Sequence, residues 1–241
     1  MITKNLPFVR FLSVGAILTL AMPVLAQDAP AGATKQPGFL EDVFANAGVI
    51  GYIIMLMSVV AVAMIIESVA TLKREKLAPP DLIDELEALF DGENFQDAVE
   101  LCENEKNYLT RVVGAGLSKL GHSFETMQVA IREMETEESV KMFQKIGYLS
   151  MLAGIGPMMG LLGTVTGMFD TFGAIASAGG SVSPAQLAGG IKGALVTTIL
   201  GLIVAIPTGV GFFFLKNRVI RTSTEINAIA EDLFERFRAK S

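Results

Sequence analysis

The chain alternates long apolar runs with strongly polar segments, and three of the apolar runs are long enough to cross a membrane. They cover residues 48–70, 146–176 and 185–215. About 20 apolar residues in a helix cross a bilayer, and the flanking basic residues lie on the cytoplasmic side. Lys and Arg follow the first run, precede the second and follow the third. The pattern predicts an all-α membrane protein with three transmembrane helices, its N-terminus outside and its C-terminus inside.

The polar segments predict helices beyond the membrane. Residues 71–145 carry apolar positions at three- and four-residue steps, which is typical of amphipathic helices, and we expect a cytoplasmic helical domain there. Residues 216–241 repeat that spacing and predict a cytoplasmic C-terminal helix. Residues 177–184 are short, polar and glycine-rich. They predict a loop on the outer side, which makes the second and third spans an antiparallel hairpin.

The N-terminus has the three parts of a secretory signal peptide, over residues 1–26. Lys4 and Arg10 form a basic start, an apolar core follows, and small residues precede the cleavage site. The alternative is an uncleaved extra span, but the apolar core is short and Pro23 interrupts it, so we favour cleavage. Residues 27–47 then form a leader rich in Ala, Pro and Gly, which ends in a short amphipathic helix at the membrane interface.

Glycines recur along one side of the second span. Gly156, Gly160, Gly163 and Gly167 are separated by four, three and four positions, and at about 100° per residue they form one narrow stripe. Small residues at this spacing let helices approach closely in lipid. The third span has a comparable face of small residues and threonines: Gly190, Gly193, Ala194, Thr197, Gly201, Ala205 and Thr208. We expect the two faces to pack together, and Pro207 to kink the third span or relieve its backbone hydrogen bonding.

Polar side chains border these two small-residue faces. Thr164 and Asp170 lie beside the glycine stripe, and Thr198 lies at the edge of the face that includes Thr197. Polar groups at membrane depth are costly unless they face protein or water. Thr164, Thr197, Thr198 and Asp170 are therefore candidates for the wall of an aqueous ion path. Plain helix packing is the simpler alternative.

Composition narrows the function classes. The net charge is −6, which disfavours nucleic acid as a partner. The sequence contains no metal-cluster motif and no phosphate-binding loop, and we expect neither a cofactor nor a metal. Cys102 is the only cysteine and His122 the only histidine, and nothing in the sequence orients them as a catalytic pair. Cys102 is interpreted as a buried structural thiol, and the protein is not expected to be an enzyme.

Charged residues near the spans have competing interpretations. Glu67, at the inner end of the first span, is expected to pair with Lys73 or Arg74, and a role in ion transfer is the alternative. Lys192, in the outer part of the third span, is interpreted as extending to the interface rather than as a pore charge. An acidic run before the second span is expected to be a solvated helix face: Glu133, Glu135, Glu137 and Glu138.

Two motifs on separate spans carry a resemblance to a known family. They are GIGPMMGLLGTVTGMFDTF at residues 154–172 and GGIKGALVTTILGLIVAIP at residues 189–207. With the order of the spans, they make the chain resemble the ExbB/TolQ/MotA family of ion-channel subunits over nearly all of its mature length. The signal peptide and the three spans are more similar to ExbB than to TolQ, and MotA-type subunits usually have four spans.

The resemblance implies a homo-pentamer in the bacterial inner membrane, with residues 27–47 and 177–184 in the periplasm. The ring would surround a single-span partner of the ExbD/TolR kind, whose transmembrane aspartate carries the proton. Proton motive force would then drive work through a TonB-like protein, which powers transport across the outer membrane. Family threonines near that aspartate match Thr164 and Thr198. A TolQ- or MotA-like motor for envelope or mechanical work, and a non-conducting membrane scaffold, are the alternatives.

One position departs from the family pattern. Many ExbB proteins carry a glutamate in the third span, within a GIxEAL motif, whereas this chain has GIKGAL with Gly193 at that place. The adjacent Lys192 does not replace the glutamate. Asp170 is then the acid candidate within the spans, although a relay of protons at membrane depth needs an acid. Either a partner supplies the acid or the coupling ion differs, and the sequence leaves proton and sodium both open.

Overall fold

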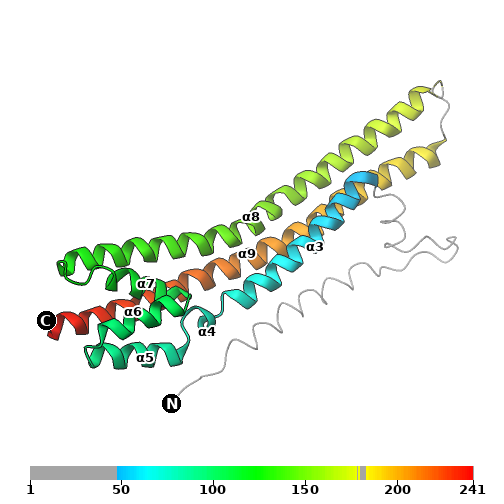
Figure 1. Cartoon of the computed structure of the whole chain (residues 1–241). Coiled ribbons are helices and arrows are strands. Elements are labelled where there is room, and N and C mark those ends of the chain that lie inside the picture. The colour runs from blue at the N-terminus through cyan, green and yellow to red at the C-terminus, as the bar shows by residue number, and fades with distance from the viewer. Residues whose placement is uncertain (1–47, 178, 180–182, 241) are drawn as a thin grey trace, which may run out of the picture. The chain divides into compact units, whose positions relative to one another are not determined.

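The computed structural model describes residues 48–177, 179 and 183–240, with side chains described as far as residue 235. Every regular element within these ranges is a helix, and the helices carry the labels α3 to α9 in Figure 1. The predicted signal peptide of residues 1–26 and the leader of residues 27–47 lie outside the described residues. The predicted all-α fold is confirmed for the part of the chain that the structure describes.

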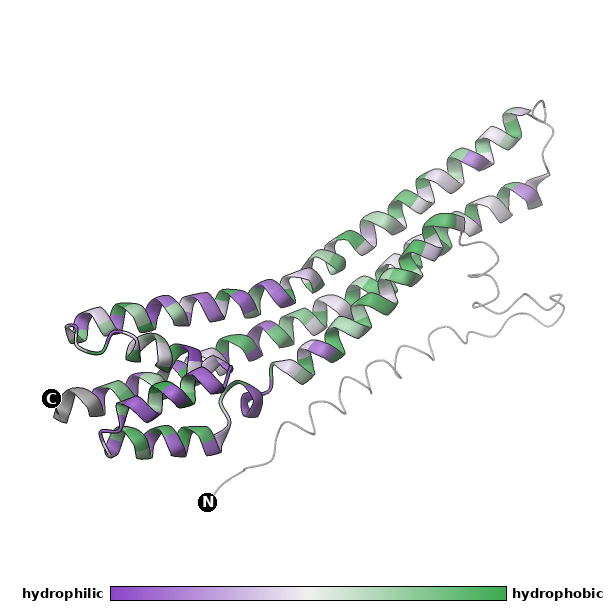
Figure 2. Ribbon diagram, in the orientation of Figure 1, coloured by the Kyte–Doolittle hydropathy of each residue, from purple (hydrophilic) through white to green (hydrophobic). Residues whose placement is uncertain are grey.

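Three helices are long and apolar enough to cross a membrane, as the hydropathy pattern predicts. They are α3 (Gly48–Thr71), α8 (Phe124–Ser177) and α9 (Pro184–Lys240). With 54 and 57 residues at 1.5 Å per residue, α8 and α9 are each about 80 Å long, against about 30 Å for a hydrocarbon core. Figure 2 shows that α8 is polar in its first part and apolar in its second, whereas α9 is apolar first and polar later. The exact positions at which the spans enter the membrane stay predictions.

Four shorter helices fill the interval between α3 and α8. They are α4 (Arg74–Leu77), α5 (Pro80–Asp91), α6 (Phe95–Asn104) and α7 (Tyr108–Leu117). Helices α5 to α7 lie beside the polar halves of α8 and α9 (Figure 1). We call this assembly the polar bundle: α4 to α7, residues 124–145 of α8 and residues 216–240 of α9. It contains the helical domain that the amphipathic spacing predicts.

Large apolar side chains form the core of the polar bundle. Phe90 of α5 lies at its centre, with ring centroids 5.8 Å from Phe95 and 5.4 Å from Phe234, both edge to face. Further core members come from α5, α7, α8 and α9: Leu86, Leu109, Val112, Val113, Ile131, Ile226 and Leu233. Burying such side chains from water contributes about 1.5–3 kcal/mol each. The hydrophobic effect therefore holds this part of the chain together.

Cys102 lies on α6 and is half-buried, facing α7. Burial raises the pKa of its thiol to about 11. The thiol is therefore almost wholly protonated near neutral pH and a poor nucleophile. His122 lies in the turn before α8, and its side chain is exposed. These positions agree with the interpretation of Cys102 as a structural thiol.

The expected pairing of Glu67 is wrong. Its carboxylate lies 2.8 Å from the Lys145 ammonium of α8, and Lys145 also donates to the Thr71 hydroxyl at 3.2 Å. Arg74 pairs with Glu225 of α9 instead, at 2.7 Å. The chain turns between α3 and α4, so Arg74 faces α9 while the last turns of α3 face α8. Sequence proximity therefore suggested the wrong partner.

The acidic run before the second span is only partly a solvated face. Glu138 is largely buried and lies between Arg111 of α7, at 3.1 Å, and Lys141, at 2.7 Å. Glu135 is nine-tenths buried. Glu133 remains exposed, in agreement with the expectation. The difference arises because α7 and α9 cover one side of α8 at this level.

Candidate functional site

The two small-residue faces pack directly against each other, with α8 and α9 antiparallel. A methyl group added to Gly163 would lie 2.5 Å from Thr197 Oγ1, and one added to Gly201 would lie 2.5 Å from the Gly156 carbonyl oxygen. Real Cβ atoms do not approach other atoms so closely, so glycine is required at both positions. The helices approach this closely because those methyl groups are missing.

The contact has a regular register along the hairpin. Gly160 faces Thr197 and Thr198, at distances of 3.0 Å from their nearest backbone atoms to an added methyl group. Gly167, two turns further along α8, faces Ala194, one turn back along α9. The four glycines of the stripe therefore all lie in the α8–α9 contact of a single chain. This places the predicted packing residues where the spacing suggests.

Three threonine hydroxyls meet at one backbone carbonyl, that of Gly160. The hydroxyls of Thr164, Thr197 and Thr198 donate to it at 3.2, 3.2 and 3.1 Å. The Thr164 and Thr198 hydroxyls also hydrogen-bond to each other. Thr164 and Thr197 have a second acceptor in the Ala194 carbonyl oxygen, at 3.2 and 2.7 Å. The structure thus brings three of the four predicted pathway residues together.

These threonines differ in how much of each side chain is exposed. Thr197 is only 4% exposed and points into the glycine stripe. Thr164 and Thr198 are half-buried and lie at the edge of the hairpin. A hydroxyl can both donate and accept a hydrogen bond. The Thr164 and Thr198 hydroxyls can therefore form hydrogen bonds with a polar group next to the hairpin. Thr197 lies too deep to do so and acts as a spacer between the helices.

Asp170 lies apart from the threonine group. It follows Thr164 by six positions, which at about 100° per residue places it roughly 120° away around α8, with the glycine stripe between them. Its side chain is exposed. The Thr164 edge of the hairpin therefore carries hydroxyl groups without Asp170. Gly193, at the position of the usual family glutamate, is half-buried.

Each long helix contains a proline and continues through it. Pro157 lies within α8 one turn before Gly160, and Pro207 lies within α9. Since proline has no backbone N–H, the carbonyl four residues earlier loses its usual donor. The Thr208 hydroxyl, next to Pro207, donates to the Val204 carbonyl oxygen at 2.7 Å. This hydroxyl bonds the carbonyl next to that of Ile203, which is the one that Pro207 deprives of its usual donor.

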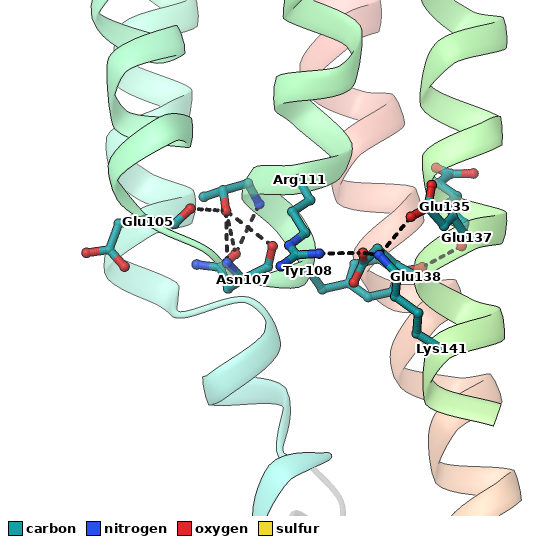
Figure 3. Close-up of polar contacts among 9 residues, drawn as sticks. Glu105, Asn107, Tyr108, Arg111, Glu135, Glu137, Glu138 and Lys141 are labelled. Carbon is teal, nitrogen blue, oxygen red and sulfur yellow. Dashed lines mark hydrogen bonds and ion pairs between the residues drawn. The ribbon is translucent and has the colours of Figure 1, made fainter. Parts of the chain in front are cut away.

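A second polar centre lies in the polar bundle (Figure 3). Tyr108 is 2% exposed, and its hydroxyl donates to Asn227 Oδ1 at 2.7 Å. The Tyr108 hydroxyl oxygen also lies 3.2 Å from Ser139 Oγ and 3.3 Å from the Glu135 carbonyl oxygen. Burial raises the pKa of Tyr108 above its usual value, which the hydrogen bond to Ser139 partly opposes. One side chain thus joins α7, α8 and α9.

The start of α7 is fixed locally and helps to position that tyrosine. Asn107 accepts a hydrogen bond from the Thr110 N–H at 3.0 Å, and its own N–H donates to the Thr110 hydroxyl at 3.1 Å. Such a reciprocal cap satisfies backbone donors that the first helical turn leaves free. The Asn-x-x-Thr spacing is a sequence signal for this cap. No comparable signal marks Asn227 as a partner, since it lies 119 positions away.

Together these features define a class: a helical membrane protein in which two long helices form a glycine-packed hairpin with hydroxyl groups at its edge. The comparison with protein families agrees. Residues 104–228 match the model of the MotA/TolQ/ExbB proton channel family, and the chain belongs to this family. The resemblance inferred from the two motifs is therefore confirmed.

Curated relatives carry names of the same kind. A putative biopolymer transport protein ExbB homolog from Methanothermobacter thermautotrophicus is 29% identical over 171 residues, which cover 70% of this chain and 60% of that relative. A putative biopolymer transport protein ExbB-like 1 from Synechocystis sp. is 30% identical over 177 residues, covering 72% of this chain and 68% of that protein. The biopolymer transport protein ExbB of Xanthomonas campestris pv. campestris is 34% identical over 108 residues, covering 45% and 42%.

Among solved structures, that of C. jejuni MotAB is similar in fold. The TM-score is 0.50 at 18% sequence identity, and the alignment covers 95% of this chain and 86% of that chain. At this identity the similarity concerns the fold alone. It supports the arrangement of the long helices and the smaller helices beside them.

Proposed function

We propose that this chain is an ExbB-like subunit of an ion-driven, energy-transducing complex in the bacterial inner membrane. In this proposal its N-terminus is periplasmic and its C-terminus cytoplasmic, and it assembles as a homo-pentamer around an ExbD-like partner. The complex powers TonB-dependent transport across the outer membrane. The observation that carries the proposal is the hydroxyl pair of Thr164 and Thr198, held at the edge of a glycine-packed hairpin.

The hydroxyl pair is suited to a carboxylate that comes from outside the chain. The hairpin edge beside Thr164 and Thr198 lacks an acid of its own, because Asp170 lies on another side of α8 and Gly193 replaces the usual glutamate. A partner aspartate next to the pair would accept hydrogen bonds from hydroxyls that otherwise donate to backbone carbonyls. These bonds favour the ionised form of the aspartate, and its protonation releases them. The two protonation states then prefer different positions of the partner.

The long helices offer a route from that exchange to mechanical work. Both α8 and α9 run unbroken from the threonines into the polar bundle. Because the backbones are in contact through glycines, a rotation of one helix forces the other to move or to repack. In this proposal a displacement at the membrane level therefore reaches the polar bundle. Protons are the proposed coupling ion. The experiment must exclude sodium as the alternative coupling ion.

Ion flux in liposomes tests the proposal directly. We would reconstitute this chain alone and with its candidate ExbD-like partner, and would impose first a pH gradient and then a sodium gradient. Proton flux that requires the partner and disappears when the partner's aspartate is changed to asparagine is the expected result. Sodium flux in its place would overturn the proton assignment. Absence of both fluxes, in a complex shown to be assembled, would favour a scaffold.

A further inference from the structure

A buried carboxyl group outside the membrane half of the chain has no role in the function proposed above. Glu135 lies on α8 within the polar bundle and is nine-tenths buried. Its Oε1 atom is fully buried and has no hydrogen-bond partner. A buried ionised carboxylate without partners is strongly disfavoured, so such a group takes up a proton or the structure opens to water. Burial therefore favours the neutral form of the Glu135 carboxyl group over its ionised form.

The groups around Glu135 come from all three helices that meet there. From α9, the Glu231 carboxylate acts on it as a like charge, while Arg132 of α8 acts as an opposite charge. From α7, the Tyr108 hydroxyl contacts the Glu135 backbone carbonyl oxygen, and Arg111 is already paired with Glu138. Figure 3 shows Glu135 together with Tyr108, Arg111 and Glu138. The charge of α9 that acts on Glu135 is thus negative.

The contact between α8 and α9 is incompletely filled about one turn before Glu135 along α8. A cavity of about 190 Å³ opens there between the two helices. Its lining includes Arg132 and Glu231, the two residues that act electrostatically on Glu135; the others are Phe124, Gln128, Ile131, Phe234 and Glu235. The cavity therefore borders the two residues that act on Glu135, although Glu135 itself does not line it.

We propose that Glu135 is a proton-operated switch that sets the spacing of α8 and α9 in the polar bundle. As the neutral acid it allows the two helices to close, and as the carboxylate it repels Glu231 and drives them apart. Opening weakens the hydrogen bonds by which Tyr108 joins α7 to both helices. Because α8 and α9 continue into the membrane spans, the pH of the compartment around the bundle then affects the hairpin itself.

The direction of the effect follows from the surroundings. Burial, and to a smaller extent Glu231, raise the pKa of Glu135 above the ordinary value for a glutamate, while Arg132 opposes them. The closed form therefore predominates at low pH, and the open form gains as the pH rises through this elevated pKa. This direction does not depend on which ion the complex conducts.

A distance measurement between the two helices tests the switch. Spin labels on Thr136→Cys and Ala228→Cys, both at exposed positions, report the α8–α9 spacing by pulsed EPR of the full chain in lipid nanodiscs, in a Cys102→Ser background. We expect the mean distance to be longer at about pH 8 than at about pH 5, a range that begins above the ordinary pKa of a glutamate. In Glu135→Gln the distance should stay short at both pH values.

Two further variants make the result decisive. Glu133→Gln removes the same charge from an exposed position two residues earlier, on nearly the opposite side of α8, and should retain the pH-dependent change of distance. Glu231→Gln, also at an exposed position, should reduce the lengthening of the distance at high pH, because it removes the charge that the Glu135 carboxylate repels. The proposal would be overturned by a pH-dependent change of distance that persists in Glu135→Gln, by an undiminished change in Glu231→Gln, or by no change in the labelled chain that keeps both glutamates.

Discussion

The same two helices pack by different rules in the membrane half of the hairpin and in the polar bundle. In the hairpin, α8 and α9 meet through glycines, and their hydrogen bonds run from threonine hydroxyls to backbone carbonyls. In the bundle they meet through large apolar side chains such as Ile131 and Leu233, and ion pairs join each of them to other helices. The change occurs along continuous helices. The mode of packing is therefore determined by the surroundings of the helices and not by their secondary structure.

The physical cause is the difference between water and lipid as solvents. Removing a leucine from water is favourable, whereas removing it from lipid tails gains little, so close backbone packing and hydrogen bonds carry helix association in a membrane. Exposure follows the same division. In the hairpin Leu161 is 60% exposed and Phe169 is 78% exposed, whereas Leu233 of the bundle is fully buried. The outside of the hairpin therefore suits lipid or another subunit.

The strongest test of this comparison is to place a large side chain in the glycine contact. We expect Gly163→Leu to prevent assembly, because Thr197 occupies the space that the new side chain needs. Overpacking of this kind typically costs about 1–3 kcal/mol or more. Gly154→Leu is the matched control, since nothing lies within 4 Å of a methyl group at that position. Size-exclusion chromatography of the purified complex measures the difference, and equal yields would contradict the close contact.

Removing one hydroxyl from the hairpin edge should affect function more than stability. We expect Thr164→Val to assemble normally, because a typical hydrogen bond contributes only about 1 kcal/mol, and to lose coupled work. Thr166→Val is the control on another side of α8, where the hydroxyl bonds only to its own helix, to Leu162 and Gly163 carbonyls. Partner-dependent proton flux is the measurement. Normal flux in Thr164→Val would show that Thr164 serves only in helix packing.

In the polar bundle, Tyr108→Phe should lower the free energy of unfolding by about 1–3 kcal/mol, since buried acceptors lose their donor. The acceptor of the shortest bond is Asn227, at 2.7 Å. Tyr148→Phe is the control because that side chain is 58% exposed. Urea unfolding of the two variants, monitored by circular dichroism, gives the difference in the free energy of unfolding. Equal midpoints for the two variants would show that the Tyr108 hydroxyl does not hold the three helices together.

The pH dependence of stability provides a smaller and more specific effect. A folded-state pKa of Glu135 above its unfolded value means that folding takes up a proton between the two values, so stability is lost as the pH rises through that window. Glu135→Gln should flatten this slope and leave the melting temperature higher at neutral pH. Thermal unfolding at a series of pH values measures both. A slope that is the same in the variant would exclude Glu135 as its source.

The smallest effect is expected at the rim. The side chains of Arg74 and Glu225 are 39% and 47% exposed, so their 2.7 Å ion pair is screened by water. Arg74→Ala should therefore change the free energy of unfolding by about 1 kcal/mol at most. Thermal melts at low and high salt give the value. A larger loss of unfolding free energy at low salt would show that the Arg74–Glu225 ion pair holds α4 against α9 more strongly than its exposure predicts.

Much of the fold could be predicted because local periodicity specifies it. The hydropathy runs located α3 and the apolar parts of α8 and α9, and the amphipathic spacing located the helices of the bundle. The glycine stripe could be placed in a helix contact because its members share one side of α8. Thr164 and Thr198 could be proposed as a pair only through the family resemblance, since nothing local joins residues 34 positions apart.

By itself, the sequence determined the number of apolar helices, the small-residue faces, the positions of the threonines and membership of a channel family. Each depends on which residue types recur at helical spacing. Only the tertiary structure decided that the Gly160 carbonyl is the shared acceptor, that Glu67 pairs with Lys145 and that Glu135 is buried. The sequence does not show which backbone carbonyl will accept a side-chain hydrogen bond. Long-range partners depend on the register in which two helices pack.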